Sequence, residues 1–381
     1  MKIKAAVLRE AGQPVTIEDI DLEAPQAGEV LVKYVNTGFC HSDLTVLGGG
    51  MGPGSYPMVP GHEAAGVVEE VGPGVENVKK GDRVVVPWLI ACGKCPECLQ
   101  GKGNVCRTSF IPLVAGTLFN GNLRMKDKSG TAVSMQSFVS GFSTHQVVDA
   151  QGLVIIPDKL PREQACFMGC CVPTGWGTVN NKADVQPGQS VAVFGCGGVG
   201  LNVIRAASFR MANPLIAVDL EGSKENIARE FGATHFINSS KEDPVPAIQK
   251  LTGGMDMGND IYLGGGVDIA FEVIGDPGAY VQAFWCLGMA GKLMSIGVIR
   301  NDETVEYPQM FLTLQDKSII GSLYGSAATH LSIPRLSELA IRGDLKLDKL
   351  ITKHFKLEEI NEVAEAMRRR EIIGRWVCDL D

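Results

Sequence analysis

Short apolar runs separated by turn residues fill the first 170 residues of the chain. EVLVKYV at 29–35 and DRVVVPW at 82–88 are typical of β-strands, and VGPG at 71–74 is typical of a turn. Valine, glycine and proline are abundant throughout this region. The pattern predicts an irregular antiparallel β domain.

After Pro187-Gly188 the pattern changes to strand-like runs that alternate with helical ones. SVAVFG leads into a helical run from Val199, and the alternation continues to about residue 322. Strands interleaved with helices predict parallel βαβ units. We therefore predict an α/β protein in which 172–322 form a doubly wound, Rossmann-type domain. Residues 1–171 and 323–381 are predicted to form a second, discontinuous and mostly-β domain.

Two further segments differ from their surroundings. LEEINEVAEAMRRR at 357–370 predicts an amphipathic helix ahead of a last strand, GRWVCDL. The stretch 252–266 is irregular and rich in glycine, and the sequence does not show its purpose.

Composition and charge exclude several classes of protein. A hydrophobic content of 45% and a charged content of 20% are typical of a globular chain. A net charge of −8 argues against a nucleic-acid-binding surface. No apolar run reaches the roughly 18 residues that a membrane span needs, and MKIKAAVLREAG does not resemble a secretory signal. The eleven cysteines therefore predict a reducing, cytoplasmic location, with thiols that are free or bound to metal.

Four cysteines within fifteen residues predict a structural zinc site. They are Cys92, Cys95, Cys98 and Cys106, with gaps of two, two and seven residues. Four thiolates form the closed tetrahedron that is typical of structural zinc. A ferredoxin-type iron–sulfur run has its fourth cysteine after three residues and before proline, whereas Arg107 follows here. Disulfides or scattered buried thiols are the remaining alternative, and the clustering argues against them.

A glycine-rich turn between a strand and a helix predicts a dinucleotide site. Its members are Gly195, Gly197, Gly198, Val199 and Gly200. Glycines there allow close approach of the pyrophosphate to the helix N-terminus. Asp219 ends the next strand, where a carboxylate accepts the ribose hydroxyls and repels a 2′-phosphate, which favours NAD over NADP. The alternative is a turn with incidental glycines and a capping aspartate.

A second metal site is spread along the chain. Cys40 lies in GFCHSD, His62 in PGHEAAG and Cys170 in MGCCVPTGWG. Two thiolates and one imidazole leave a fourth position open, as catalytic zinc requires. Each residue alone is more often structural, and spacing does not prove that residues 130 apart converge.

The motifs together resemble those of the zinc-dependent medium-chain alcohol dehydrogenases over essentially the whole chain. They are GFCHSD, GHEAAGVVEEVG, the four-cysteine lobe, GCCVPTG at 169–175, GCGGVG with Asp219, and VDIAFEVIG. The resemblance implies a GroES-like catalytic domain with a structural zinc lobe beside the Rossmann domain. It also implies two zinc ions per subunit, one structural and one catalytic.

The same resemblance implies roles around the catalytic zinc. Cys40, His62 and Cys170 would bind the metal. Asp43 would hold the other imidazole nitrogen of His62. Glu63 would lie near the metal from the far side and ligate it transiently.

Cofactor and proton-relay roles are likewise implied. Thr174 would pack by the nicotinamide, Lys224 would lie near the adenosine ribose, and Arg375 would contact the pyrophosphate. Ser42 would be the first relay group for the substrate proton. Many relatives place a histidine three residues further on, where this chain has Thr45.

The end of the relay is left open by the sequence. His41 stands where some relatives have an arginine on the pyrophosphate. Either His41 or water would then serve as the terminal base. Residues expected near the substrate pocket are Trp88, Phe138, Val298 and Leu323.

The predicted function is a zinc- and NAD-dependent oxidoreductase that interconverts an alcohol and its aldehyde by hydride transfer, with a lipophilic or aromatic primary alcohol expected as substrate. A polyol or amino-alcohol dehydrogenase is one alternative. A thiol-conjugate formaldehyde dehydrogenase is another, but it needs charged residues for the thiol's carboxylates, and none is evident near Met51 or Ile111. A non-catalytic NAD-binding protein is a different class, and it would not need an open zinc site.

The long segment from Cys106 to His145, which tetrameric microbial relatives lack, favours a homodimer.

Overall fold

The computed structural model describes residues 1–50, 55–258 and 262–380. The chain divides into two compact units. The first unit comprises Met1–Pro173 and Ala327–Asp381, and the second comprises Thr174–Ser326. No helix within the described ranges is long and apolar enough to cross a membrane.

The first unit consists mainly of two β-sheets. One has the order β1-β2-β7-β8-β4, and the other has the order β10-β6-β5-β3-β20-β19 with β9 also paired to β3. The strands are β1 (Lys2–Val7), β2 (Thr16–Leu22), β3 (Glu29–Gly38), β4 (Met58–Val59), β5 (Ala64–Val71), β6 (Arg83–Val86), β7 (Met125–Lys126), β8 (Ala132–Met135), β9 (His145–Asp149), β10 (Val154–Ile155), β19 (Ile351–Lys356) and β20 (Arg375–Asp379).

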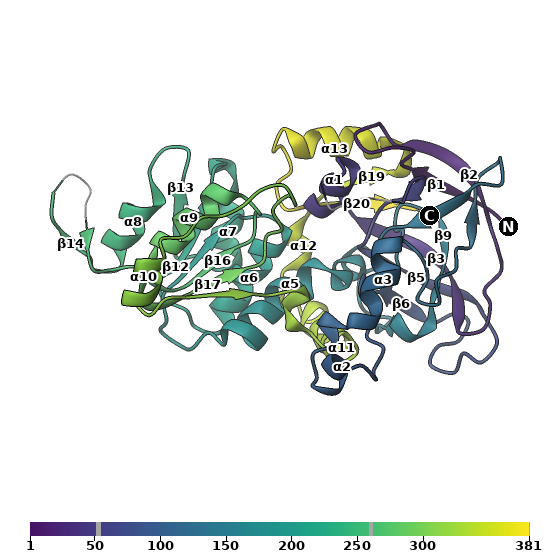
Figure 1. The fold of residues 1–381 in the computed structure, drawn as a ribbon, viewed down its shortest axis with the longest axis horizontal. Coiled ribbons are helices and arrows are strands. Elements are labelled where there is room, and N and C mark those ends of the chain that lie inside the picture. The colour runs from purple at the N-terminus through teal and green to yellow at the C-terminus, as the bar shows by residue number, and fades with distance from the viewer. Residues whose placement is uncertain (51–54, 259–261, 381) are drawn as a thin grey trace. The chain divides into compact units, whose positions relative to one another are not determined.

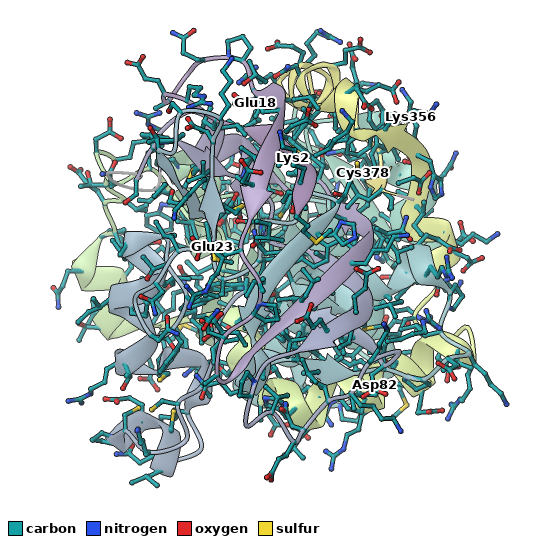
Figure 2. The ribbon with its side chains drawn as sticks, turned by 90° about the vertical axis from the view of Figure 1, so that its right-hand side faces the viewer. Lys2, Glu18, Glu23, Asp82, Lys356 and Cys378 are labelled. Atoms are coloured by element: carbon teal, nitrogen blue, oxygen red, sulfur yellow. The ribbon has the colours of Figure 1, made fainter. Side chains whose placement is uncertain are left out.

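Strand β3 is the centre of the second sheet. It pairs with β5, β9 and β20, all antiparallel, so it is buried almost along its whole length. Figure 1 shows the consequence for the chain path, because β20 from the C-terminus lies among strands from the N-terminus. Figure 2 looks at this end of the unit, with Lys2 on β1 and Glu18 on its antiparallel neighbour β2.

Short helices connect the strands of the first unit. They are α1 (His41–Leu47), α2 (Pro96–Leu99), α3 (Arg107–Ala115), α4 (Arg162–Ala165), α11 (Thr329–Ile341), α12 (Leu347–Leu350) and α13 (Ile360–Arg368), with 3-10 turns at Gly103–Val105, Ala150–Gly152, Cys166–Gly169 and Leu357–Glu359. The amphipathic segment predicted at 357–370 forms one of these turns followed by α13. Its apolar residues Ile360, Val363 and Ala364 join the main core of the unit.

The second unit is built on a parallel sheet of order β13-β12-β11-β16-β17-β18. Taken in chain order, this is 3-2-1-4-5-6, the arrangement of dinucleotide-binding folds, and the order reverses between β11 and β16. Strand β11 is buried throughout because a parallel sheet is covered on both faces. The predicted combination of a Rossmann-type domain with a mostly-β domain is therefore confirmed.

Helices alternate with the strands of this sheet. The strands are β11 (Val191–Phe194), β12 (Leu215–Asp219), β13 (His235–Asn238), β16 (Val267–Glu272), β17 (Leu287–Ser295) and β18 (Ser318–Gly321). The helical segments are α5 (Cys171–Gly177), which begins in the first unit, a π-helix at Thr178–Ala183, α6 (Gly198–Phe209), α7 (Glu225–Phe231), α8 (Pro244–Leu251), α9 (Pro277–Trp285), α10 (Gln309–Leu314), and 3-10 turns at Gly222–Lys224 and Tyr324–Ser326. The glycine-rich stretch 252–266 contains the paired strands β14 (Met255–Asp256) and β15 (Tyr262–Leu263).

Candidate active site

Asp43 is placed by the start of helix α1. Cys40 is the residue before the helix, and its backbone N–H donates to Asp43 Oδ2 at 2.9 Å. An acidic side chain in the first turn satisfies a free backbone donor and interacts favourably with the helix dipole. The same short segment therefore fixes both the Cys40 thiol and the Asp43 carboxylate.

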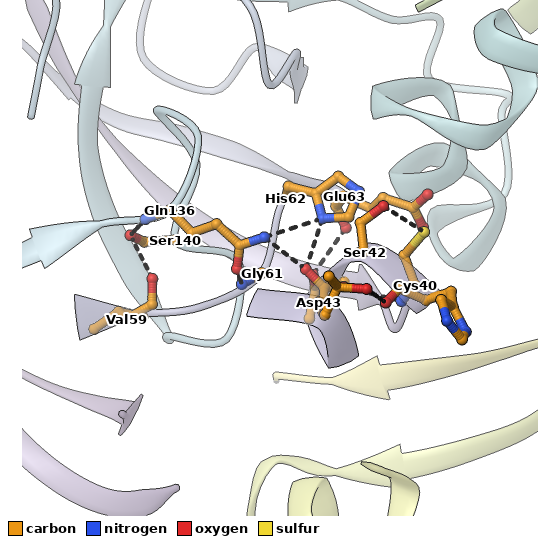
Figure 3. Close-up of polar contacts among 12 residues, drawn as sticks. Cys40, Ser42, Asp43, Val59, Gly61, His62, Glu63, Gln136 and Ser140 are labelled. Carbon is orange, nitrogen blue, oxygen red and sulfur yellow. Dashed lines mark hydrogen bonds and ion pairs between the residues drawn. The ribbon is translucent and has the colours of Figure 1, made fainter. Parts of the chain in front are cut away.

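The other oxygen of Asp43 holds His62. Nδ1 of His62 lies 2.6 Å from Asp43 Oδ1 (Figure 3). His62 lies in the segment between β4 and β5, and both side chains are buried. Because Nδ1 is engaged by a carboxylate, Nε2 is the nitrogen left to bind a metal.

Three buried side chains converge beside this pair. Ligand atoms of Cys40, His62 and Glu63 all lie within 4.8 Å of one another. Cys170, after the 3-10 turn at Cys166–Gly169, has its thiol against that of Cys40. This hydrogen bond with Cys170 lowers the pKa of Cys40 well below its usual value, which favours the thiolate form that metals bind.

Glu63 is paired with Arg375 from β20. Arg375 Nη2 donates to Glu63 Oε2, and both side chains are buried. Burial raises the pKa of Glu63 to about 7. Gly38 is needed here, because a Cβ at that position would overlap Glu63 Oε2 and the ring of Phe167. The structure thus brings Arg375, which the family resemblance assigns to the pyrophosphate, against a residue of the metal cluster.

The cluster fits a catalytic zinc ion. It offers two thiols, an imidazole whose orientation is fixed through Nδ1, and a nearby carboxylate. Oε1 of Glu63 has no hydrogen-bond partner among the described residues although it is buried. An unpartnered buried oxygen beside two thiols and an imidazole matches a site that gains its remaining partner when a cation binds.

Ser42 and His41 lie at the rim of this cluster. Ser42 is half-buried, and its Oγ is 4.0 Å from Cys40 Sγ. His41 is exposed, and its carbonyl accepts a hydrogen bond from Thr45 Oγ1 at 3.1 Å. Ser42 therefore faces the metal cluster more closely than His41 does.

The four-cysteine lobe has the dimensions of a closed zinc site. Its sulfur atoms lie within 4.8 Å of one another, with Cys92 and Cys98 at 3.9 Å and Cys95 and Cys106 at 3.8 Å. Zinc–sulfur bonds of about 2.3 Å in a tetrahedron give sulfur–sulfur edges of about 3.8 Å. All eleven cysteines of the chain are free. The spacing fits a metal ion between four thiolates.

The glycine turn of the second unit fits a pyrophosphate. Gly195 has a φ of 102°, and a Cβ on Gly200 would overlap the carbonyl oxygen of Gly195. A Cβ on Gly197 would meet nothing within 4 Å, so this glycine, which precedes α6, leaves open space at the helix N-terminus. Backbone donors and the helix dipole attract an anion there.

Asp219 is the last residue of β12 and lies beside that turn. Its Oδ2 accepts from the N–H of Cys196 at 2.7 Å, and its Oδ1 accepts from the N–H of Glu221 at 3.0 Å. Lys224 Nζ lies 3.1 Å from Asp219 Oδ2. The carboxylate and the ammonium group form a polar pair at the carboxyl end of the sheet, which fits a sugar with adjacent hydroxyls.

Thr174 is the first residue of the second unit. Its side chain is buried, and its carbonyl accepts from Thr178 Oγ1 at 2.8 Å. The next residue, Gly175, packs against α6, where a Cβ would meet Val199 O at 2.7 Å. Close packing of α5 on the helix that carries the glycine turn fixes Thr174 relative to that turn.

The residues expected in the substrate pocket come from both units. Trp88 is half-buried against the core of the first unit. Phe138 is buried, with its ring 6.3 Å from that of Phe119. Val298 is 59% exposed and Leu323 is half-buried, both in the second unit.

Two other positions, Met51 and Ile111, do not indicate which substrate class the enzyme uses. Met51 lies outside the described residues, and Ile111 is exposed on α3. A cavity of about 820 Å³ in the first unit is lined by Phe119 among others, and none of the predicted site residues lines it.

Gln136 was missed by the sequence reasoning. Its side-chain amide contacts both the Asp43 carboxylate and the backbone of Gly61 (Figure 3). A single glutamine in SMQSFVSG carries no spacing or composition signal. Only the fold brings it to residues 75 and 93 positions away.

Comparison with known proteins decides the family. Residues 26–158 match the alcohol dehydrogenase GroES-like domain, and 198–341 match the zinc-binding dehydrogenase domain. An NDMA-dependent alcohol dehydrogenase of Amycolatopsis methanolica is 37% identical, and the match covers 97% of this chain and 96% of that protein. The chain belongs to the zinc-dependent medium-chain alcohol dehydrogenase family.

Two further relatives of this alcohol dehydrogenase carry more specific names. An S-(hydroxymethyl)glutathione dehydrogenase of Synechocystis is 36% identical over 96% of this chain and 97% of its own length. The crystal structure of a benzyl alcohol dehydrogenase from Acinetobacter calcoaceticus matches with a TM-score of 0.90 at 32% identity, covering 100% of both chains.

Membership confirms the predicted enzyme class. The alcohol dehydrogenase is a zinc- and NAD-dependent oxidoreductase that interconverts an alcohol and its carbonyl product. A non-catalytic NAD-binding protein is therefore no longer a competing interpretation. The alcohol and thiol-conjugate alternatives both fit the relatives found.

Proposed function

We propose that this enzyme oxidises lipophilic or aromatic primary alcohols to aldehydes and catalyses the reverse reduction. The observation that carries the proposal is the buried convergence of Cys40, His62 and Glu63, with Cys170 against Cys40. Half-buried Trp88 offers an apolar, aromatic surface in the same unit. The likeness to a benzyl alcohol dehydrogenase over the full chain supports the aromatic substrate class.

In this proposal each side chain of the first unit has one task. Cys40, His62 and Cys170 hold the catalytic zinc, and Asp43 orients His62. When bound, zinc supplies Lewis acidity toward the substrate oxygen, and the nicotinamide accepts the hydride. Glu63 would supply a further carboxylate beside the metal, and its pairing with Arg375 keeps that carboxylate from being a lone buried charge.

Ser42 and His41 are proposed to remove the proton. Ser42 Oγ, on α1, lies 4.0 Å from Cys40 Sγ. It accepts the alcohol proton and passes it on, because a hydroxyl both donates and accepts hydrogen bonds. Exposed His41 is the next group, and it passes the proton to solvent.

The second unit is proposed as the NAD-binding domain, and the first as the catalytic domain. The turn formed by Gly195, Gly197, Gly198, Val199 and Gly200 would receive the pyrophosphate. Asp219 and Lys224 would bind the adenosine ribose, Thr174 would contact the nicotinamide, and Arg375 stays a proposed contact of the pyrophosphate. The residues proposed for the substrate pocket remain Trp88, Phe138, Val298 and Leu323.

The cofactor assignment predicts the effect of Asp219→Gly. A 2′-phosphate on the ribose would meet the buried Asp219 carboxylate, and a like-charge contact costs several kcal/mol. The ratio of kcat/KM for NAD over NADP should therefore fall by about 100-fold in the variant. Steady-state kinetics with both cofactors measures the ratio.

Glu221→Gln is the matched control for this substitution, because it removes a neighbouring carboxylate from the same turn. It should leave the ratio close to that of the wild type. Equal use of NAD and NADP by the wild-type enzyme would contradict the role given to Asp219.

A substrate panel tests the function itself. Aliphatic, benzylic, terpenoid, polyol and amino alcohols are supplied with NAD, and the reduced nicotinamide is followed by its absorbance. We expect the highest kcat/KM with benzylic or other lipophilic primary alcohols. Ser42→Ala should lower kcat on the best of them while leaving the zinc content at two, and His41→Gln should do so to a smaller extent. Turnover of polyols alone would overturn the proposed substrate class.

The thiol-conjugate reaction is the second candidate, since relatives named S-(hydroxymethyl)glutathione dehydrogenase match almost the whole chain. Formaldehyde with glutathione is therefore an arm of the same panel. A kcat/KM for the conjugate above that for every simple alcohol would favour this candidate over the first.

A homodimer in the cytoplasm is proposed as well. The long segment from Cys106 to His145 supports the dimer, and eleven free cysteines support a reducing compartment. Light scattering that gave the monomer mass of 40.7 kDa would overturn the dimer.

A further inference from the structure

The side-chain amide of Gln136 joins two segments of the metal cluster. Gln136 follows β8 directly and is 5% exposed. Its Oε1 accepts a hydrogen bond from the N–H of Gly61 at 2.7 Å, and its Nε2 donates to Asp43 Oδ1 at 3.0 Å. The orientation of the amide is fixed by chemistry, because a backbone N–H can only donate and an ionised carboxylate can only accept.

Asp43 therefore accepts hydrogen bonds from three donors, and Gln136 is the third. Its Oδ1 accepts from Nδ1 of His62 and from Nε2 of Gln136, and its Oδ2 accepts from the N–H of Cys40. The Asp43 side chain is completely buried. In such a site each added donor takes a share of the carboxylate's negative charge. Gln136 thus limits how strongly Asp43 polarises the imidazole of His62.

The backbone around Gln136 is held by contacts of its own. The N–H of Gln136 bonds the carbonyl of Val59 at 3.2 Å, and Ser140 Oγ donates to the same carbonyl at 3.0 Å. Ser137, Phe138 and Ser140 all have positive φ values, between 51° and 58°. Residues other than glycine adopt this left-handed conformation uncommonly, and such strain concentrates at functional sites.

We propose that Gln136 is a positioning residue of the catalytic zinc site. It fixes the Gly61–His62 backbone through its oxygen and tunes the donor strength of His62 through its nitrogen on Asp43. It touches neither the metal nor the substrate. The inference rests on the proposed assignment of His62 as a zinc ligand.

The test replaces Gln136 with methionine, which keeps the length of the side chain and removes both hydrogen bonds. Outer partners of metal ligands typically contribute 10- to 100-fold to metal affinity or activity. We therefore expect zinc to be lost to a chelator about ten times faster than from the wild type, with a comparable fall in kcat. In the enzyme with cobalt in place of the catalytic zinc, the visible absorption band should shift.

Gln146→Met is the matched control. Gln146 is equally buried in the same unit, where its amide contacts Met125 Sδ and the N–H of Val147. This variant should change thermal stability at most. An unchanged cobalt band and unchanged zinc loss in Gln136→Met, with only a lowered Tm, would overturn the proposal.

A double-mutant cycle with Asp43→Asn tests whether Gln136 acts on the zinc site through Asp43. If Gln136 acts through Asp43, adding Gln136→Met to Asp43→Asn should change the cobalt band far less than it does in the wild type. If Gln136→Met shifted the cobalt band equally in the wild type and in Asp43→Asn, the proposal would be overturned. Should the methionine variant not fold, Gln136→Asn takes its place, because it retains the amide but withdraws it by one methylene. Failure of the underlying zinc assignment is distinguishable, since the wild-type protein would then show no catalytic-site cobalt band at all.

Discussion

Replacing Cys170 with serine is expected to leave a folded chain that oxidises alcohols at about a thousandth of the wild-type rate or less. A serine hydroxyl is a poor substitute for a thiolate as a zinc ligand. Lewis-acid stabilisation contributes several kcal/mol to a transition state, and each 1.4 kcal/mol is a factor of ten in rate. Elemental analysis should find about one zinc per chain, in the four-cysteine lobe.

Cys378→Ser is the control for that substitution. Cys378 (Figure 2) is a buried thiol on β20 of the same unit, outside both metal clusters. It should keep two zinc ions and most of the activity. A Cys170→Ser enzyme that retained two zinc ions and near-normal turnover would contradict the assignment of Cys170.

The second large effect is expected from Cys98→Ser, and it concerns folding rather than catalysis. Structural zinc sites contribute apparent binding free energies of about 10 kcal/mol or more to folding, which is comparable to the whole stability of a typical domain. Loss of one of the four thiolates should therefore release the zinc and unfold the lobe at 92–106. Limited proteolysis should cut the variant within that lobe, and its soluble yield should fall.

Glu97→Gln is the control within the same lobe, because it removes the ion pair between half-buried Glu97 and exposed Arg107 and leaves all four thiolates in place. Surface pairs of this kind contribute little, so its proteolysis pattern should match the wild type. If the lobe in Cys98→Ser resisted proteolysis as well as the lobe in the control does, the metal would not be what stabilises it.

The parts of the molecule that the sequence predicted are those encoded by local spacing. The four cysteines fall within fifteen residues, and the glycine turn lies between one strand and one helix, so short-range geometry alone constrains them. The Rossmann-type sheet follows from the alternation of strands and helices. Cys40, His62 and Cys170 could be grouped only through resemblance to a family, because nothing local links residues so far apart.

Contacts that depend on tertiary structure escaped prediction. Glu63 meets Arg375 across 312 positions, and the resemblance had given that arginine to the cofactor alone. Gln136 reaches Asp43 because β8 ends beside the segment that leads to His62, and no periodicity signals such a meeting. Phe138 was chosen as an aromatic residue near the expected pocket, yet its left-handed backbone and its packing on Phe119 are set by the turn after Gln136.

The interruption of the first unit by the second has a consequence for protein synthesis. Strand β20 pairs with β3, but the ribosome makes β20 only after every residue of the second unit. The second unit is continuous and can fold as it emerges, whereas residues 36–38 of β3 lack their β20 partner until then. Arg375 also reaches Glu63 only at this stage. In a nascent chain the buried Glu63 carboxylate therefore gains its ion-pair partner only after β20 has been translated.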